Sequence, residues 1–279
     1  MTRIYDCTSE SDTSHSDTSH SNYQAHISLA RMAIGRGALV VIPTDTVYGV
    51  AADAFNAEAV QLLLDAKGRS RQSPPPVLIP GIPTLDALAV DVPQPVRDLV
   101  AAFWPGGLTV IVNAQPSLVW DLGETRGTVA LRMPSNQIAL DLLAATGPLA
   151  VSSANLSGMP ATRDAQAAEA ALGESIEVYL DGGTAGSTYE SVFGESGEGS
   201  STIVDATGFE TNGGFLHIVR SGVISEDAIA AVVGDVLAAA PASPGVPTEP
   251  SEADATPTIA APSQDAADED TRNETDAGR

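Results

Sequence analysis

Helix-like and strand-like segments alternate along most of this 279-residue chain. Ile27, Ala30 and Ile34 recur at the spacing of one helix face, and Gly35 and Gly37 end that pattern. The valine-rich run at 38–42 that follows is typical of a buried strand. Repeated alternation of this kind is the pattern of strands and helices that pack together in one unit. We therefore expect one α/β domain with a sizeable mixed sheet.

The same patterns predict the other elements. We expect a helix from the cap Asn56 to Ala66, ended by Gly68, and a last helix capped by Ser225. The run Pro74–Pro76 removes backbone donors, so we expect the strand after it to lie at an edge or to be a loop. Further helices are predicted over 96–104, 138–145 and 164–172, and strands over 77–79, 108–112, 129–132, 149–152, 176–180, 203–205 and 216–219.

The two ends of the chain differ in composition from the alternating part. Residues 1–22 are mostly Ser, Thr, Asp and His and contain a perfect five-residue tandem repeat, which is typical of a low-complexity linker. From about residue 241 large apolar side chains are almost absent, so this segment cannot bury enough surface to order itself. We predict a polar N-terminal segment over 1–22, a folded domain over 23–240 and a disordered acidic Ala/Pro-rich tail over 241–279.

The net charge of −23 and the single cysteine, Cys7, exclude several classes of protein. Between Tyr23 and Ser225 there are twenty acids against ten bases, which argues against a broad basic surface for nucleic acid. One cysteine allows neither a disulfide nor a cysteine-cluster metal site, and we expect no protein metal site. Because we find neither a secretory signal nor an apolar run long enough to span a bilayer, we expect a cytoplasmic protein without membrane attachment.

Several familiar catalytic motifs are absent from the sequence. It has no GxxxxGK[ST], no GxGxxG after a strand, no HExxH and no GxSxG. Three of the four histidines precede the predicted core and the fourth, His217, lies in a predicted strand, so they form no catalytic set. If this protein binds a nucleotide, it therefore does so without a P-loop and without a dinucleotide-binding fold.

Lys67 is the only lysine among thirteen basic residues, and it stands two residues before Arg69. If 67–69 is extended, residues i and i+2 point to one side and the two cations converge. Converging cations suit a polyphosphate. The alternative is a helix C-terminus that carries cations to complement its dipole.

Two further polar clusters follow predicted strands. Thr44 lies in PTDTVYG directly after a buried strand, at the kind of strand end where α/β sheets bind ligands. Its alternative is a turn in which threonine side chains satisfy local backbone groups. Arg132 ends an apolar strand and must meet an anion if it is buried. That anion is either a ligand or a carboxylate of the domain itself.

The remaining clusters contain Ser153 and Asn155, which share an i, i+2 relation after a strand, and Ser201 followed later by Arg220. A serine-rich capping turn is the alternative for the first pair.

The order of all these clusters resembles the YrdC/TsaC family of threonylcarbamoyl-AMP synthases, over about 180 residues. The matching segments are PTDTVYG at 43–49, KGR at 67–69, FWPGGLT at 103–109, ALRMP at 130–134, SSANLSG at 152–158, DGG at 181–183, STIVD at 201–205 and RSG at 220–222.

The resemblance implies a YrdC-like fold, a twisted mixed α/β sheet with flanking helices and a large concave pocket. It implies a nucleotidyltransferase that joins L-threonine, bicarbonate or CO2, and ATP into L-threonylcarbamoyl-AMP, releasing pyrophosphate, with Mg²⁺ accompanying ATP. The product would pass to a downstream threonylcarbamoyl transferase complex that acts on tRNA, with direct tRNA binding weak or absent. By this resemblance the phosphates are held by Lys67, Arg69, Ser153 and Asn155, the nucleotide also by Arg220, and threonine by Thr44, Arg132 and Ser201.

The chain departs from the family pattern in two places. Ser70 replaces a proline and Leu78 stands where a histidine can occur. The link from Gly183 to Ser201 is long and rich in Gly, Ser and Glu, so we hypothesise a lid there, with a surface insertion as the alternative. Other functions that remain open are an RNA-binding module, a carbamoyl-transfer domain like those of hydrogenase maturation factors, and an inactive paralogue.

Overall fold

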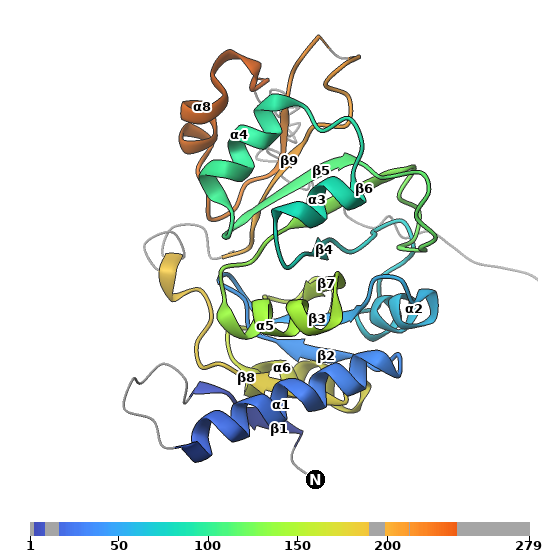
Figure 1. The fold of residues 1–279 in the computed structure, drawn as a ribbon, viewed down its shortest axis with the longest axis vertical. Helices are drawn as coiled ribbons and strands as arrows, with labels where there is room; N and C mark the ends of the chain where they lie inside the picture. Colours follow the sequence, from blue (N-terminus) through green and yellow to red (C-terminus); the bar gives the residue numbers. More distant parts are fainter. Residues whose placement is uncertain (1–2, 9–16, 190–198, 212, 239–279) are drawn as a thin grey trace, which may run out of the picture. The chain divides into compact units, whose positions relative to one another are not determined.

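The computed structural model describes residues 3–8, 17–189, 199–211 and 213–238. Within this part of the chain ten strands form one sheet in the order β1-β8-β2-β3-β7-β4-β6-β5-β9-β10 (Figure 1). Parallel and antiparallel neighbours are mixed, so the predicted α/β class with a mixed sheet is confirmed. The strands are β1 Ile4–Asp6, β2 Val40–Ile42, β3 Gly49–Asp53, β4 Val77–Leu78, β5 Leu108–Asn113, β6 Thr128–Arg132, β7 Leu149–Ser153, β8 Val178–Asp181, β9 Thr202–Asp205 and β10 His217–Arg220.

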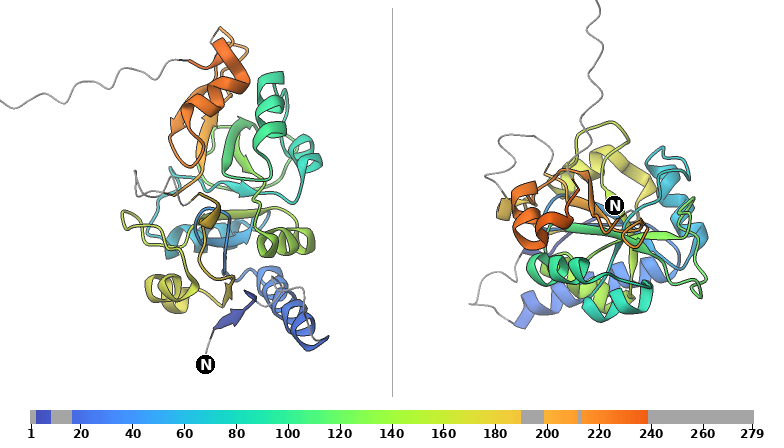
Figure 2. Two further views of the ribbon diagram at one scale, coloured as in Figure 1. Left: turned by 90° about the vertical axis from the view of Figure 1, so that its left-hand side faces the viewer. Right: turned by 90° about the horizontal axis from the view of Figure 1, so that it is seen from above.

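Helices cover both faces of the sheet (Figure 2). Alternate residues of β2 enter different apolar clusters. Val40 and Ile42 pack in the cluster that contains residues of α1 and α5, and Val41 packs in the cluster that contains residues of α2 and α6. Because successive strand side chains point to opposite faces, these two helix pairs lie on opposite sides of the sheet. The α-helices are α1 Asp17–Gly35, α2 Ala57–Ala66, α3 Ile82–Leu88, α4 Gln94–Phe103, α5 Gln137–Thr146, α6 Ala165–Leu172 and α8 Glu226–Val233, with 3-10 turns η2 Gly173–Ser175, η3 Ser187–Tyr189 and η4 Gly234–Val236.

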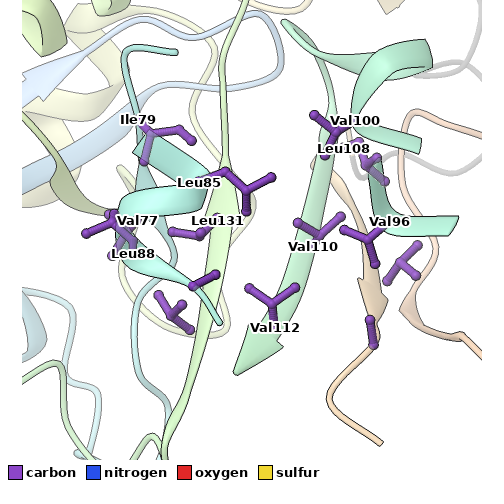
Figure 3. Close-up of a cluster of buried hydrophobic side chains, with 14 of the residues drawn as sticks. Val77, Ile79, Leu85, Leu88, Val96, Val100, Leu108, Val110, Val112 and Leu131 are labelled. Atoms are coloured by element: carbon purple, nitrogen blue, oxygen red, sulfur yellow. The ribbon is translucent and has the colours of Figure 1, made fainter. Parts of the chain in front are cut away.

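A third apolar cluster lies between β4, β5, β6 and β9 on one side and α3, α4 and α8 on the other (Figure 3). Leu131 of β6 is fully buried there, and pairs across the sheet with Val77 of β4 and Val110 of β5. The domain therefore has two packed wings, one around β1-β8-β2-β3-β7 and one around β6-β5-β9-β10, with β4 between them.

The position of β4 contradicts the expectation of an edge strand or loop. β4 lies inside the sheet, antiparallel to β7 and parallel to β6. The prolines do not prevent this, because they precede the strand and the carbonyl of Pro76 accepts a hydrogen bond from the backbone N–H of Val151. The rule on prolines applies to the strand itself and not to the segment that leads into it.

Three elements were not predicted: β1, β3 and α3. β1 pairs with β8, so residues 4–6 of the segment predicted to be a polar linker lie in the sheet, and α1 already begins at Asp17. The first copy of the tandem repeat and the tail from 239 onward lie outside the described residues. β3 begins with Gly49, where a β-carbon would lie 2.5 Å from Cγ1 of Val151, so only glycine allows β3 to approach β7 so closely.

The predicted helix ends are confirmed where capping residues mark them. The side chains of Asn56 and Ser225 accept hydrogen bonds from the backbone N–H groups of Ala59 and Ala228. Gly37, after the end of α1, has φ +81°, the left-handed conformation that favours glycine. None of the helices in the described ranges is long and apolar enough to cross a membrane.

We expect Leu131→Ala to lower the free energy of unfolding by about 2–5 kcal/mol, because it leaves a cavity in the middle of the sheet. Urea titration followed by circular dichroism measures this loss. The control is Val119→Ala, at a side chain that is 91% exposed, which should change stability by less than about 0.5 kcal/mol. A loss below about 1 kcal/mol for Leu131→Ala would contradict the assigned core.

Candidate active site

Lys67 and Arg69 lie on a left-handed turn that ends helix α2. The N–H of Gly68 bonds to the carbonyl of Asp65 and the N–H of Arg69 to that of Leu64, which is the Schellman pattern. Gly68 has φ +63°. The expectation that residues 67–69 are extended is therefore wrong. The alternative of a helix C-terminus is correct, and the turn still directs both cations to the end of β7.

The ammonium group of Lys67 is buried against the turn that follows β7. Its Nζ donates to the carbonyls of Ser153 and Asn155, and its own backbone carbonyl accepts from the N–H of Ser157. The residue is only 1% exposed. Lys67 thus fixes the conformation of the turn on which two of the predicted phosphate-binding residues lie.

Arg69 reaches the same turn from its other side. Its Nη1 donates to Oγ of Ser152 at 3.1 Å, so the two cations are anchored within the SSANLSG segment, and Ser152 is a contact that the sequence did not single out. Burial, and next the nearby positive charge of Arg69, lower the pKa of Lys67 to about 7. The site therefore has a lysine whose charge is adjustable near neutral pH and that an incoming anion would stabilise in its charged form.

The side chain of Asn155 is only half satisfied. Its Nδ2 donates to the carbonyls of Leu156 at 2.9 Å and Met159 at 2.6 Å. Its Oδ1 is buried and has no hydrogen-bond partner among the described residues. An unpaired buried amide oxygen is costly, so this atom can accept a hydrogen bond from a bound ligand.

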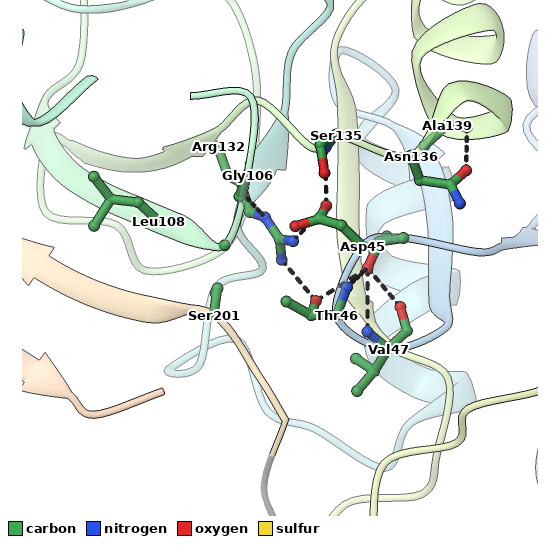
Figure 4. Close-up of polar contacts among 12 residues, drawn as sticks. Asp45, Thr46, Val47, Gly106, Leu108, Arg132, Ser135, Asn136, Ala139 and Ser201 are labelled. Atoms are coloured by element: carbon green, nitrogen blue, oxygen red, sulfur yellow. Dashed lines mark hydrogen bonds and ion pairs between the residues drawn. The ribbon is translucent and has the colours of Figure 1, made fainter. Parts of the chain in front are cut away.

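Arg132 is buried and surrounded by acceptors (Figure 4). Its Nε donates to the carbonyl of Gly106 at 2.9 Å and its Nη1 to Oγ1 of Thr46 at 3.0 Å. Its Nη2 forms an ion pair with Oδ1 of Asp45 at 2.8 Å. The domain therefore supplies an anion for this arginine, which is one of the two possibilities that the sequence left open.

Thr44 takes part in a compact turn beside that ion pair. Its hydroxyl donates to the carbonyl of Val47 at 2.6 Å and accepts from the N–H groups of Thr46 and Val47, each at 3.2 Å. This is the threonine-stabilised turn that the sequence analysis gave as the alternative. The turn positions Asp45 and Thr46 toward Arg132.

Ser201 and Arg220 lie together at the start of β9 and the end of β10. Nη2 of Arg220 donates to the carbonyl of Ser201 at 2.8 Å and to its Oγ at 2.9 Å, and the same Oγ is 2.8 Å from Oγ1 of Thr109. The N–H of Thr202 bonds to the carbonyl of Gly107 at 3.0 Å. The Gly106–Gly107 backbone thereby joins the start of β9 to Arg132, whose hydrogen bond to Gly106 is drawn in Figure 4.

The predicted residues thus form two neighbouring groups. The cationic group is Lys67, Arg69 and the 152–155 turn, and the second group surrounds Arg132. The backbone connects them, because Gly49 pairs with Ser153 and the carbonyl of Tyr48 accepts from the N–H of Ala154 at 2.8 Å. The sequence analysis did not single out five residues that complete these groups. Four of them lie inside the quoted motifs: Asp45, Thr46, Thr109 and Ser152. The fifth, Tyr189, lies outside every motif, and its hydroxyl accepts a hydrogen bond from the N–H of Gly107.

A cavity of about 280 Å³ lies beside Thr44 and Asp45, with walls from 135–137 and from 182–188. A larger cavity of about 620 Å³ lies next to Arg3, Leu62 and Glu174. We place the site at the smaller one, because its lining includes Thr44 and the Asp45 partner of Arg132, whereas the larger one contains none of the predicted residues.

Comparisons with known proteins agree with this geometry. The family model of the Sua5/YciO/YrdC proteins, described as telomere recombination, matches residues 32–222. A Mycobacterium tuberculosis protein with the provisional name threonylcarbamoyl-AMP synthase is 43% identical over 234 residues, which are 84% of this chain and 96% of that protein. The Bacillus subtilis threonylcarbamoyl-AMP synthase is 34% identical, over 75% of this chain and 57% of its own length.

One solved structure carries an amino acid. The crystal structure of Pyrococcus abyssi Sua5 complexed with L-threonine is similar to this chain with a TM-score of 0.65 and 31% identity. The similarity covers 76% of this chain and 58% of that chain.

The lowered pKa of Lys67 predicts a pH-dependent stability. Between about pH 7 and 10.5 the unfolded chain binds the proton that the folded chain has lost. The free energy of unfolding should therefore rise with pH across this window, relative to Lys67→Met, by about 1 kcal/mol per pH unit. Urea titrations of both proteins at pH 7, 8 and 9 measure the difference, with Arg36→Met as the control. A difference that does not change with pH would contradict the depressed pKa.

Proposed function

Because the chain belongs to the Sua5/YciO/YrdC family, we propose that it is a threonylcarbamoyl-AMP synthase. It joins L-threonine, bicarbonate or CO2, and ATP into L-threonylcarbamoyl-AMP and releases pyrophosphate. The observation that carries this proposal is the convergence of Lys67 and Arg69 on the turn after β7. Two cations on a polar turn match a nucleoside triphosphate, and an acyl-adenylate is formed at one of its phosphates.

The cationic group holds the triphosphate in this proposal. The amine of threonine first reacts with CO2 to give a carbamate, and a carbamate oxygen then attacks the α-phosphorus of ATP. The bond from that phosphorus to the bridging oxygen breaks, and the electron pair leaves with pyrophosphate. Lys67 and Arg69 stabilise the charge that develops on the phosphates, with the hydroxyl of Ser153 as a hydrogen-bond donor. The Nδ2 of Asn155 already donates to two carbonyls, so in this proposal its Oδ1 accepts from an N–H or O–H group of the ligand rather than binding a phosphate oxygen. Mg²⁺ enters as part of the substrate, bound to the phosphates of ATP.

The group around Arg132 binds threonine in this proposal, together with Ser201 and the turn of Thr44. A guanidinium group is suited to a carboxylate by its paired donors. In the free protein Asp45 already occupies Nη2 of Arg132, so the substrate carboxylate has to share or displace that ion pair. Arg220, which donates to Oγ of Ser201, contacts the nucleotide in this proposal.

The reaction classifies the enzyme as a nucleotidyltransferase. An acyl-adenylate is a reactive mixed anhydride, and its chemistry requires an acceptor that takes the threonylcarbamoyl group. In this proposal the acceptor reaction is the modification of tRNA by a separate transferase complex. The acid-rich composition of the folded domain supports this division of labour, because twenty acids against ten bases argue against a broad basic surface for tRNA.

Pyrophosphate release from ATP tests this function. It should require both L-threonine and bicarbonate, and Lys67→Met should lower kcat about 10²- to 10³-fold by removing one charge-stabilising group. Arg36→Met, which removes an exposed cation in the turn after α1, is the matched control and should retain full activity. If the folded wild-type protein releases no pyrophosphate in response to threonine, an inactive paralogue becomes the better interpretation.

A further inference from the structure

Tyr189, the last residue of η3, reaches the group around Arg132 from the long segment after β8. Its hydroxyl accepts a hydrogen bond from the N–H of Gly107 at 3.0 Å. A β-carbon on Gly107 would lie 3.2 Å from that hydroxyl and 3.3 Å from Cζ, so the ring packs directly on the glycine backbone. The backbone N–H of Tyr189 bonds to the carbonyl of Gly186 at 3.0 Å, which closes the η3 turn.

The glycines under Tyr189 also hold Arg132. The carbonyl of Gly106 accepts from Nε of Arg132, and Nη2 of that arginine pairs with Oδ1 of Asp45. Oδ1 also accepts from the N–H of Ser135 at 2.9 Å, whereas the buried Oδ2 has no hydrogen-bond partner among the described residues. Burial, and next the negative charge of Asp45, raise the pKa of Tyr189. Asp45 also raises this pKa as a hydrogen-bond partner of the phenol. The phenol therefore keeps a proton that it can donate to the carboxylate of Asp45.

Substrate binding changes the charge balance at this point. In the free protein one guanidinium faces one carboxylate. When the carboxylate of an amino acid also binds Arg132, two buried anions share one cation, and Asp45 needs another donor.

We propose that Tyr189 is a positioning residue for the amino-acid substrate: its hydroxyl donates to Oδ2 of Asp45 in the substrate-bound state and thereby leaves Arg132 available to the substrate carboxylate. This inference rests on the proposed function, because it takes Arg132 as the carboxylate site. A donor that is needed mainly in the bound state contributes to binding and not to folding of the free protein.

The test compares Tyr189→Phe with Tyr179→Phe. Tyr179 of β8 is a matched control, because its hydroxyl also makes one hydrogen bond to the backbone, to the carbonyl of Gly173 in η2 at 2.8 Å. For Tyr189→Phe we expect the KM and the dissociation constant of L-threonine to rise roughly ten- to hundredfold, the range for loss of a hydrogen bond to a charged group. The kcat and the KM for ATP should stay close to those of the wild type. The unfolding midpoint without threonine should fall by a similar amount in both variants, because each loses one hydrogen bond to the backbone, and the control should leave the KM and the dissociation constant of L-threonine unchanged.

A second ligand separates positioning from a structural role. L-Threoninamide lacks the carboxylate and does not compete with Asp45 for Arg132. Its dissociation constant, measured by calorimetry, should be nearly equal for wild type and Tyr189→Phe. Equal losses for L-threonine and its amide, or an unchanged or lower KM for threonine, would overturn the role of Tyr189.

The outcomes also distinguish this inference from the proposed function. Threonine binding and threonine-dependent pyrophosphate release in the wild type, with no effect of Tyr189→Phe, would overturn only the inference. A wild-type protein that binds no threonine would overturn both.

Discussion

The buried ammonium group of Lys67 is the interaction on which the cationic half of the site depends. It connects the end of α2 to two carbonyls of the turn after β7, and these carbonyls are directed at it rather than at solvent. Arginine could not replace it easily, because a planar guanidinium does not fit a site built for a compact point charge. The single lysine of the chain is thus first a structural element, which prepares the turn before any ligand arrives.

The second half of the site follows a different principle. Around Arg132, groups that a substrate would use already contact the protein: Asp45 pairs with the guanidinium, and the hydroxyl of Thr44 stabilises its own turn. A substrate that binds there would replace hydrogen bonds within the protein by hydrogen bonds to itself. The net gain in binding free energy is then the difference between these two sets of hydrogen bonds. Specificity for an amino acid then depends on how well the displaced protein groups find new donors.

Local chemistry made much of the fold predictable from the sequence. Asn56 and Gly68 mark the two ends of α2, and both were identified because capping depends on residues close in sequence. The interior position of β4 could not be predicted in this way, since the pairing partner Val151 is distant along the chain. β3 was missed for a similar reason: Gly49 weakens a strand by its own propensity and is required only by its contact with β7.

For the site, too, the sequence identified features that depend on nearby residues and missed those that depend on distant ones. The motifs identified where Lys67, Arg69, Ser153 and Asn155 would meet, but the geometry was wrong, because an extended segment was assumed where a helix ends in a left-handed turn. For Arg132 the sequence required an anion without specifying which one, and Asp45 emerges only from the folded chain. Tyr189 had no motif to mark it.

The two-residue strand β4 lies between the two groups of site residues. It pairs through only two residues with β6 and two with β7, and its two side chains enter different apolar clusters, Val77 one and Leu78 another. The cationic residues stand on the wing of β7, and Arg132 and Ser201 on the wing of β5, β6 and β9. Reactants that contact both groups of residues would bridge β4, so that part of the order of the reaction centre would be supplied by what it binds.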